Sequence, residues 1–264
     1  MMARTKMVQI LLASLISCAG LAGGRVAGGQ VNTSASHAVS AAVTVPFVGC
    51  ASDGQVGPLK APAGKNKVVA IPVAAALRLA YYQAEDSPGV LAPRGWHCFS
   101  TYGSNGANLF VSPDPIDSKT VFSDDWKGFL GPAVQISVSD GGTSGRFEVA
   151  QVVARVFPAY KGFAQNVIAE GIEPARDFPF GPYPSDKLTY RAKNIVEFET
   201  PANAHGLGTD SLLEMNAGPI DGVAVISGAD RNLTHLSARV PATDSDLIPY
   251  MIKRAESEAA AGKD

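Results

Sequence analysis

The sequence is poor in cysteine, in charge of either sign and in long apolar runs, and each scarcity excludes a class of protein. Lys and Arg number 22 against 24 Asp and Glu, and no basic block breaks the net charge of −2. This balance gives no electrostatic reason to expect binding to nucleic acid. Beyond residue 22, no stretch approaches the roughly 18 apolar residues of a membrane-spanning helix. The remaining chain therefore resembles an ordinary globular protein.

Motifs for metal binding and catalysis are also missing. The chain has 4 His, and no two of them have the i, i+4 spacing or the HExxH form of a zinc site. It contains no P-loop, no GxGxxG motif and no GxSxG nucleophile turn. The carboxylates are scattered over loops, so no glycosidase pair is recognisable. We therefore predict no metal and no cofactor, and the sequence favours a protein that is not an enzyme.

The first 22 residues have the pattern of a secretion signal. Arg4 and Lys6 form a short basic segment, and residues 7–16 are then almost wholly apolar. A run of about ten apolar residues has the length of a signal-peptide core and is too short to span a bilayer. Small residues follow it, as a signal peptidase requires. We predict that this segment directs export of the chain.

Two cleavage sites compete at the end of this signal. Residues 15–18, Leu-Ile-Ser-Cys, match a bacterial lipobox, in which the Cys becomes lipidated and forms the mature N-terminus. Because Ala19 follows Cys18, the sorting rule of enteric-type lipoproteins implies the outer membrane. The alternative is cleavage after Ala22, which gives a periplasmic or secreted protein. Residues 23–40 are typical of a flexible tether, so we expect membrane contact through the lipid anchor only.

Cysteine pairing follows from this cleavage. The three Cys are Cys18, Cys50 and Cys98. Export leaves Cys50 and Cys98 as an even pair in either case, since Cys18 is lipidated or discarded. In an oxidising compartment a disulfide between them is the default, and two buried free thiols are the alternative. A loop of this size would stabilise the folded chain by about 4 kcal/mol in the loop-entropy account.

The hydrophobic pattern predicts an α+β domain over residues 41–264. Short hairpin links join most strands and the helices come in groups, which favours a mainly antiparallel sheet with three to four helices. The Pro-rich loop at residues 173–187 is a candidate break between two subdomains. We expect strands at 41–47, 67–73, 96–101, 107–111, 133–139, 188–198, 220–226 and 233–240, and helices at 74–84, 149–156, 158–171 and 245–259.

Two groups of side chains are candidates for a binding surface. Phe178, Phe180 and Tyr183 alternate with prolines, and such a stiff aromatic loop can serve as a binding surface. The alternative is that these rings pin the loop to the core. Trp96 and His97 form the second group. They lie at the start of a hairpin that is predicted by the two strand-like runs on either side of residues 103–106, Gly-Ser-Asn-Gly.

Export, a tether and one disulfide, without catalytic spacing, favour a non-catalytic envelope protein that binds an unknown partner or ligand. The alternative is a secreted hydrolase whose site is assembled from distant residues. In that case His97, His205 or His235 would act with a Ser and an Asp. The two hypotheses differ in whether the fold brings such a His within hydrogen-bond reach of a Ser or a carboxylate in a cleft.

Three segments carry a resemblance to known sequences. They are PGVLAPRGWHC at residues 88–98, YGSNG at residues 102–106 and FPFGPYP at residues 178–184. With them the chain resembles an uncharacterised family of exported bacterial proteins, over most of its mature length. That family has no assigned activity, so the resemblance implies a location in the bacterial envelope and no catalytic residue.

Overall fold

The computed structural model describes residues 42–261. The predicted signal, the lipobox with Cys18 and the tether at residues 23–40 lie outside these residues. Within residues 42–261, no helix combines the length and the apolar character that crossing a membrane requires. The fold is α+β, as the hydrophobic pattern predicts.

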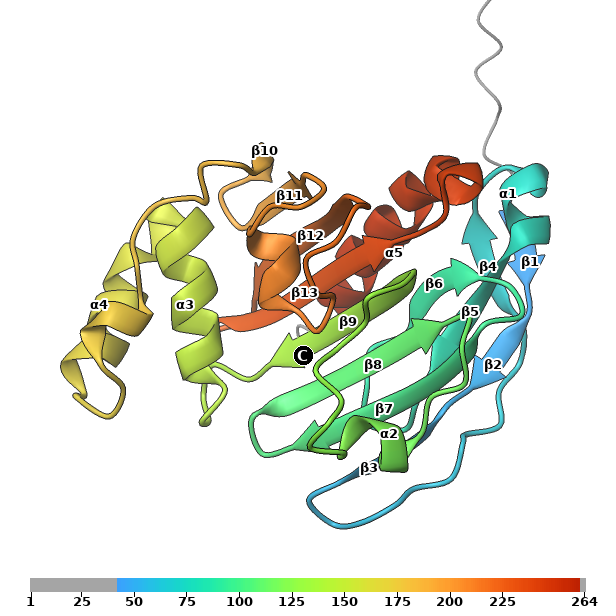
Figure 1. Ribbon diagram of the computed structural model, residues 1–264, viewed down its shortest axis with the longest axis horizontal. Helices are drawn as coiled ribbons and strands as arrows, with labels where there is room; N and C mark the ends of the chain where they lie inside the picture. The colour runs from blue at the N-terminus through green and yellow to red at the C-terminus, as the bar shows by residue number, and fades with distance from the viewer. Residues whose placement is uncertain (1–41, 262–264) are drawn as a thin grey trace, which may run out of the picture. The chain divides into compact units, whose positions relative to one another are not determined.

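An eight-stranded sheet forms the centre of the fold (Figure 1), in the order β10-β11-β12-β13-β9-β8-β7-β3. All neighbouring strands run antiparallel except β3 and β7, which are parallel. The sheet is therefore mixed, although mostly antiparallel. Its strands are β3 (Ala51–Gly54), β7 (His97–Gly103), β8 (Gly106–Ser112), β9 (Ala133–Ser139), β10 (Lys187–Ala192), β11 (Ile195–Thr200), β12 (Ile220–Ser227) and β13 (Asn232–Arg239).

Two smaller sheets complete the β structure. One pairs β1 with β4 antiparallel, and the other has the order β2-β5-β6 with β2 and β5 parallel. The mixed character of the fold therefore recurs outside the large sheet. The strands of the two smaller sheets are β1 (Ala42–Val45), β2 (Phe47–Gly49), β4 (Lys67–Ala70), β5 (Leu79–Gln83) and β6 (Val90–Pro93).

Five α-helices occur in residues 42–261, more than the three to four that we predicted. The additional helix is α2, a single turn whose N-cap Asp117 accepts a hydrogen bond from the N–H of Thr120. It buries no residue, so hydrophobic periodicity could not reveal it. The helices are α1 (Val73–Arg78), α2 (Ser118–Val121), α3 (Arg146–Val156), α4 (Lys161–Ala169) and α5 (Ile248–Ala261).

One face of the large sheet, called here the α5 face, is covered by α5 and the small sheets. Met251, Ala255 and Ala259 are buried along α5 at a spacing of four residues, which places them on one side of the helix. They belong to the same apolar cluster as Val223 of β12 and Leu236 of β13. At about 25 cal/mol per Å² of buried apolar surface, this cluster is a major source of stability.

The opposite face, called here the α3 face, packs against α3, and α4 packs in turn against α3. Val149, Val152, Val153 and Val156 are all buried, as their helical spacing predicts. α4 begins after a short 3₁₀ turn at Pro158, and Gly171, with φ of 68°, follows its C-cap in the left-handed conformation that glycine favours. The sequence thus predicts this helix pair well.

The predicted hairpin and disulfide are both present. β7 and β8 pair around a tight turn between Gly103 and Gly106. Cys50 is bonded to Cys98, with their Cα atoms 5.4 Å apart. The bond ties the segment between β2 and β3 to the start of β7, so it staples the edge of the large sheet.

Two predicted elements are wrong in their details. The helix expected at 74–84 ends at Arg78, and residues 79–83 form β5 instead. Residues 79–82 are all buried and pair with β2 and β6, so tertiary pairing overrides their helix propensity. The long strand expected at 188–198 is a hairpin, β10 and β11.

The loop at residues 173–187 joins parts of one sheet. β8 and β9 precede this loop, β10 to β13 follow it, and all six strands belong to the eight-stranded sheet. The described chain therefore does not have separate sheets on the two sides of this loop, as a subdomain break at residues 173–187 would require.

Candidate functional site

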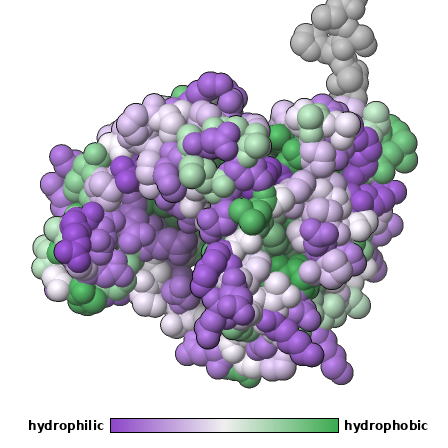
Figure 2. Space-filling model, viewed as in Figure 1, coloured by the Kyte–Doolittle hydropathy of each residue, from purple (hydrophilic) through white to green (hydrophobic). Residues whose placement is uncertain are grey.

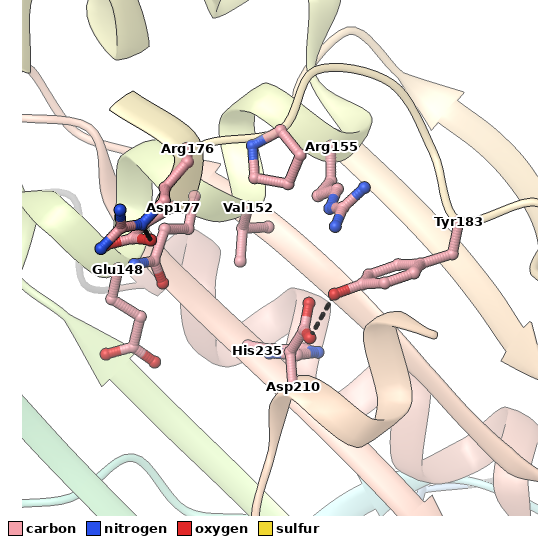
Figure 3. A pocket seen from close by; sticks show the side chains of 10 residues that line it. Glu148, Val152, Arg155, Arg176, Asp177, Tyr183, Asp210 and His235 are labelled. Carbon is pink, nitrogen blue, oxygen red and sulfur yellow. Dashed lines mark hydrogen bonds and ion pairs between the residues drawn. The ribbon is translucent and has the colours of Figure 1, made fainter. Parts of the chain in front are cut away.

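A polar cavity of about 350 Å³ opens between α3 and the α3 face of the sheet. Its other walls come from two 3₁₀ turns, η2 (Ala175–Asp177) and η3 (Leu207–Asp210), and from the loop after η2. Figure 2 shows the surface hollowed beside α3, with mostly hydrophilic residues around the hollow. The lining residues, most of them labelled in Figure 3, are Glu148, Gln151, Val152, Arg155, Arg176, Asp177, Pro179, Tyr183, Asp210 and His235.

One side of α3 supplies the long wall. Glu148, Gln151, Val152 and Arg155 follow the i, i+3, i+4, i+7 spacing that places side chains on one side of a helix. These residues lie beside the buried valines of α3 on the helix surface. Because the valines pack on the sheet, their burial fixes the direction in which the neighbouring polar side chains point. Glu148 and Arg155 consequently stand at opposite ends of the cavity, as Figure 3 shows.

Arg155, Tyr183 and Asp210 form a connected group at one end. The Arg155 guanidinium carbon lies 3.9 Å from the centroid of the Tyr183 ring, an arrangement favourable for a cation–π contact. The Tyr183 hydroxyl donates to Oδ1 of Asp210 at 2.7 Å. Burial, followed by this bond to Asp210, raises the pKa of Tyr183 to about 12. Asp210 is exposed as a residue, yet partial desolvation of its carboxyl by the surrounding protein raises the pKa of that group.

A second layer of hydrogen bonds holds η3, and with it Asp210. Asp186 accepts from the Thr200 hydroxyl and from the Leu207 N–H, each at 2.8 Å. The Gly208 N–H donates in turn to the Thr200 hydroxyl at 3.0 Å. A Cβ on Gly206 would lie 1.9 Å from Oδ1 of Asp186, so only glycine fits there. The cavity is thus formed before any ligand binds.

His235 lies on β13 at the floor of the cavity. It is 4% exposed, and its ring packs edge-on against Phe198 with the ring centroids 5.4 Å apart. Burial lowers the pKa of His235 to about 4, so the imidazole is neutral at pH 7. Its Nε2 lies 3.4 Å from the hydroxyl oxygen of Ser237.

The three rings of the predicted aromatic loop lie in different environments. Phe178 is 2% exposed and belongs to the core under α3, so this ring pins the loop. Tyr183 lines the cavity. Phe180 is 48% exposed, and the Lys161 ammonium lies 5.3 Å from its ring centroid.

Trp96 and His97 do not join this site. Trp96 packs against the cluster on the α5 face, and His97 is exposed at the start of β7. The structure therefore does not bring the two predicted groups of binding residues together.

The His residues of the alternative hydrolase are also separated. His97 is exposed on β7. His205 is exposed, and its backbone carbonyl accepts from the Ser185 hydroxyl at 2.6 Å; among residues 42–261 its ring makes no hydrogen bond, although its charge slightly lowers the pKa of Asp210. His235 does share the cavity with carboxylates, those of Glu148, Asp177 and Asp210. Its neighbour Ser237, however, is 1% exposed and does not line the cavity.

A metal centre is not evident at this site. Among residues 42–261, no group of three or more His, Cys, Asp and Glu side chains could hold a metal ion. The carboxylates of the cavity are instead accompanied by the guanidinium groups of Arg155 and Arg176.

Glu148, Arg155 and Asp210 were not expected as site residues. The first two could have been found from the polar stripe that accompanies the valines of α3. Asp210 carries no sequence signal, because only the fold brings η3 to α3.

No family model, no curated protein and no solved structure matches the chain.

Proposed function

We propose that this chain is an exported bacterial envelope protein whose disulfide-stapled domain binds a small polar ligand in the cavity beside α3. The main support is that three charged side chains of the lining, Arg155, Glu148 and Asp210, form no ion pair with one another. Within residues 42–261, Arg155 has no carboxylate at ion-pair distance, and Glu148 forms neither an ion pair nor a side-chain hydrogen bond. Charges that are only half exposed and left unpaired are costly, so an external partner would relieve this cost.

The size and rigidity of the cavity support the same proposal. Its volume of about 350 Å³ lies within the range of small-molecule sites, which starts near 300 Å³. The bonds of Asp186 and Thr200 hold one wall, and the cation–π contact holds Arg155 against Tyr183. A preformed site reduces the ordering cost that binding would otherwise carry.

We favour binding over hydrolysis because of what surrounds His235. A serine nucleophile must be exposed to a substrate, whereas Ser237 is buried and separated from the cavity lining. The neutral imidazole and Asp210 then contribute polarity and hydrogen-bonding capacity to the floor.

Export rests on the first 22 residues and is supported by the disulfide. Bonds of this kind persist in oxidising compartments such as the periplasm. We propose lipidation at Cys18 and the outer membrane as location, with cleavage after Ala22 as the alternative. The intact mass of the protein from a bacterial host decides between an acylated start at Cys18 and a start at Gly23, and an unprocessed N-terminus would contradict export.

Ligand binding is tested by thermal shift of the mature protein against single sugars, amino acids, nucleotides and organic acids. We expect at least one class to raise the melting temperature. Arg155→Met should abolish that shift, and Arg191→Met should retain it, because Arg191 is paired with Glu197 on β11, away from the cavity. The proposal fails if no probe shifts the protein or if both variants behave alike.

A further inference from the structure

The arrangement of charges in the cavity specifies more than a polar ligand. Arg176 and Asp177 lie side by side, with Nε and Oδ1 3.7 Å apart, so their charges largely cancel. What remains of the charged lining is one cation, Arg155, and two anions, Glu148 and Asp210. The site is therefore complementary to a ligand that carries one anion and two cations.

Arg155 is suited to a carboxylate. A guanidinium presents five N–H donors in a planar fork that matches a carboxylate in two-point contact. Among residues 42–261, one acceptor, the Gly181 carbonyl at 3.4 Å, takes a side-chain hydrogen bond from Arg155. The Tyr183 ring covers one face of the fork and leaves its edge free to donate into the cavity.

Asp210 is suited to an ammonium group close to that carboxylate. The Tyr183 hydroxyl bonds to Oδ1, and within residues 42–261 no hydrogen bond engages Oδ2. Because Arg155 lies over the ring of Tyr183 and Asp210 at its hydroxyl, the two charges stand around one tyrosine side chain (Figure 3). That juxtaposition fits the adjacent carboxylate and α-ammonium of an amino acid.

Glu148 is suited to a second cation farther along α3. It precedes Arg155 by seven residues, which corresponds to about 10 Å along a helix. Val152 and Gln151 line the wall between these two ends. An aliphatic chain can lie along Val152 while its terminal charge reaches Glu148.

We infer that the cavity binds a basic amino acid of the lysine type, with its carboxylate on Arg155, its α-ammonium on Asp210 and its side-chain ammonium on Glu148. This inference rests on the proposed ligand-binding function and names the class of ligand. His235 forms a neutral floor beneath it and adds no charge that would repel the α-ammonium.

The test is calorimetric titration of the mature protein with L-lysine and three analogues that each lack one charged group. Cadaverine lacks the carboxylate, 6-aminohexanoate lacks the α-ammonium, and L-norleucine lacks the side-chain ammonium. We expect L-lysine to bind and each analogue to bind at least about tenfold more weakly, since each loses a charge-assisted hydrogen bond. These comparisons use the unaltered protein, so they do not depend on the folding of any variant.

Three variants assign each charge to its residue. Arg155→Met should remove the preference for L-lysine over cadaverine. Asp210→Asn should remove the preference for L-lysine over 6-aminohexanoate. Glu148→Gln should remove only the preference over L-norleucine and leave norleucine binding unchanged. Glu197→Gln, on β11 outside the cavity, serves as the control and should retain every preference.

The possible outcomes distinguish a wrong class of ligand from the absence of a binding site. The inference is overturned if L-norleucine binds as tightly as L-lysine, or if a sugar or an organic acid binds in the cavity and L-lysine does not. The latter result would leave the proposed function in place. If no probe of any class binds, the proposed function fails together with the inference.

Discussion

The two faces of the eight-stranded sheet are built from the same strands and have different compositions. Along β13, Leu236 and Ala238 point to the α5 face and join its apolar cluster, whereas His235 and Ser237 alternate with them on the α3 face. The α5 face is closed by a helix, two small sheets and the neighbouring disulfide. The α3 face is only partly covered, and the cavity opens there.

This difference indicates a division of roles within one sheet. Apolar burial on the α5 face supplies stability without requiring any particular chemistry. On the α3 face, buried polar residues such as Gln135, Ser137 and His235 occupy positions where apolar ones would pack at lower cost. Polar residues in such positions are expected where a protein uses a surface for binding.

The largest expected effect on stability concerns the disulfide between Cys50 and Cys98. Replacing both cysteines, as in Cys50→Ala with Cys98→Ala, should lower the free energy of unfolding by about 4 kcal/mol, because the bond closes a loop with a sequence separation of 48 residues. Urea denaturation measures it, and reduction of the unaltered protein should give a similar loss. A loss below about 1 kcal/mol would show that the staple is dispensable.

Substitutions at two neighbouring residues of β13 allow a direct comparison of how much each face of the sheet contributes to stability. Leu236→Ala should cost about 3 kcal/mol of unfolding free energy, because it leaves a cavity in the core on the α5 face. Ser237→Ala should cost about 1 kcal/mol or less, since only a weak hydrogen bond is lost. Equal losses in urea denaturation would contradict a difference between the faces.

A third prediction uses the acid sensitivity of the α3 face. Burial lowers the pKa of His235 to about 4, below its unfolded value, so the unfolded chain binds more protons between about pH 6.5 and 4. Stability should therefore fall as the pH falls through this window. His235→Gln should reduce the loss between pH 7 and 4.5 by about 2 kcal/mol. Identical pH profiles for the two proteins would refute a buried, neutral histidine.

The smallest effect is of opposite sign and lies at the margin of the α5 face. Burial, and then the negative charge of Glu199 on the paired strand, raise the pKa of Asp221 to about 6. The folded chain binds more protons between about pH 4 and 6, so this group lowers stability as the pH rises through that window. Asp221→Asn should raise the unfolding free energy at pH 7 by about 1 kcal/mol.

Urea denaturation from pH 4 to 8 tests this fourth prediction. The gain from Asp221→Asn should largely disappear toward pH 4, where the folded carboxyl is protonated and the unfolded carboxyl is about half protonated. Glu199→Gln is the matched variant and should recover part of the same gain. A gain that is equal at every pH would contradict a raised pKa.

Local patterns predicted much of this fold, and long-range pairing accounts for what they missed. The valines of α3, the turn between Gly103 and Gly106 and the pairing of Cys50 with Cys98 follow from spacing, turn chemistry and counting. β5 could not be predicted in this way, because its helix-forming residues become a strand only when β2 and β6 flank them. The strand order of the large sheet is likewise set by contacts between distant segments.

Two residues of the candidate site were named from the sequence: Tyr183, whose Pro-rich loop is distinctive, and His235, as one of three candidate histidines of the alternative hydrolase. Glu148 and Arg155 lie on a helix that was predicted, and their meaning depends on what faces that helix. Asp210 and His235 reach the cavity from segments that follow α3 only after a long stretch of chain. Charged side chains form a binding site only when the fold brings them close together. Hydrophobic periodicity gives no information about such long-range contacts.

The most direct test of the account is an NMR titration of the mature, isotope-labelled protein with L-lysine, mapped on the backbone amides and on the His235 ring. We expect the largest shifts in α3, η2, the loop to Tyr183, η3 and β13 around His235, and we expect Arg155→Met to remove them. Shifts confined to the α5 face, or no shifts at all, would contradict the assignment of ligand binding to the polar face of the sheet.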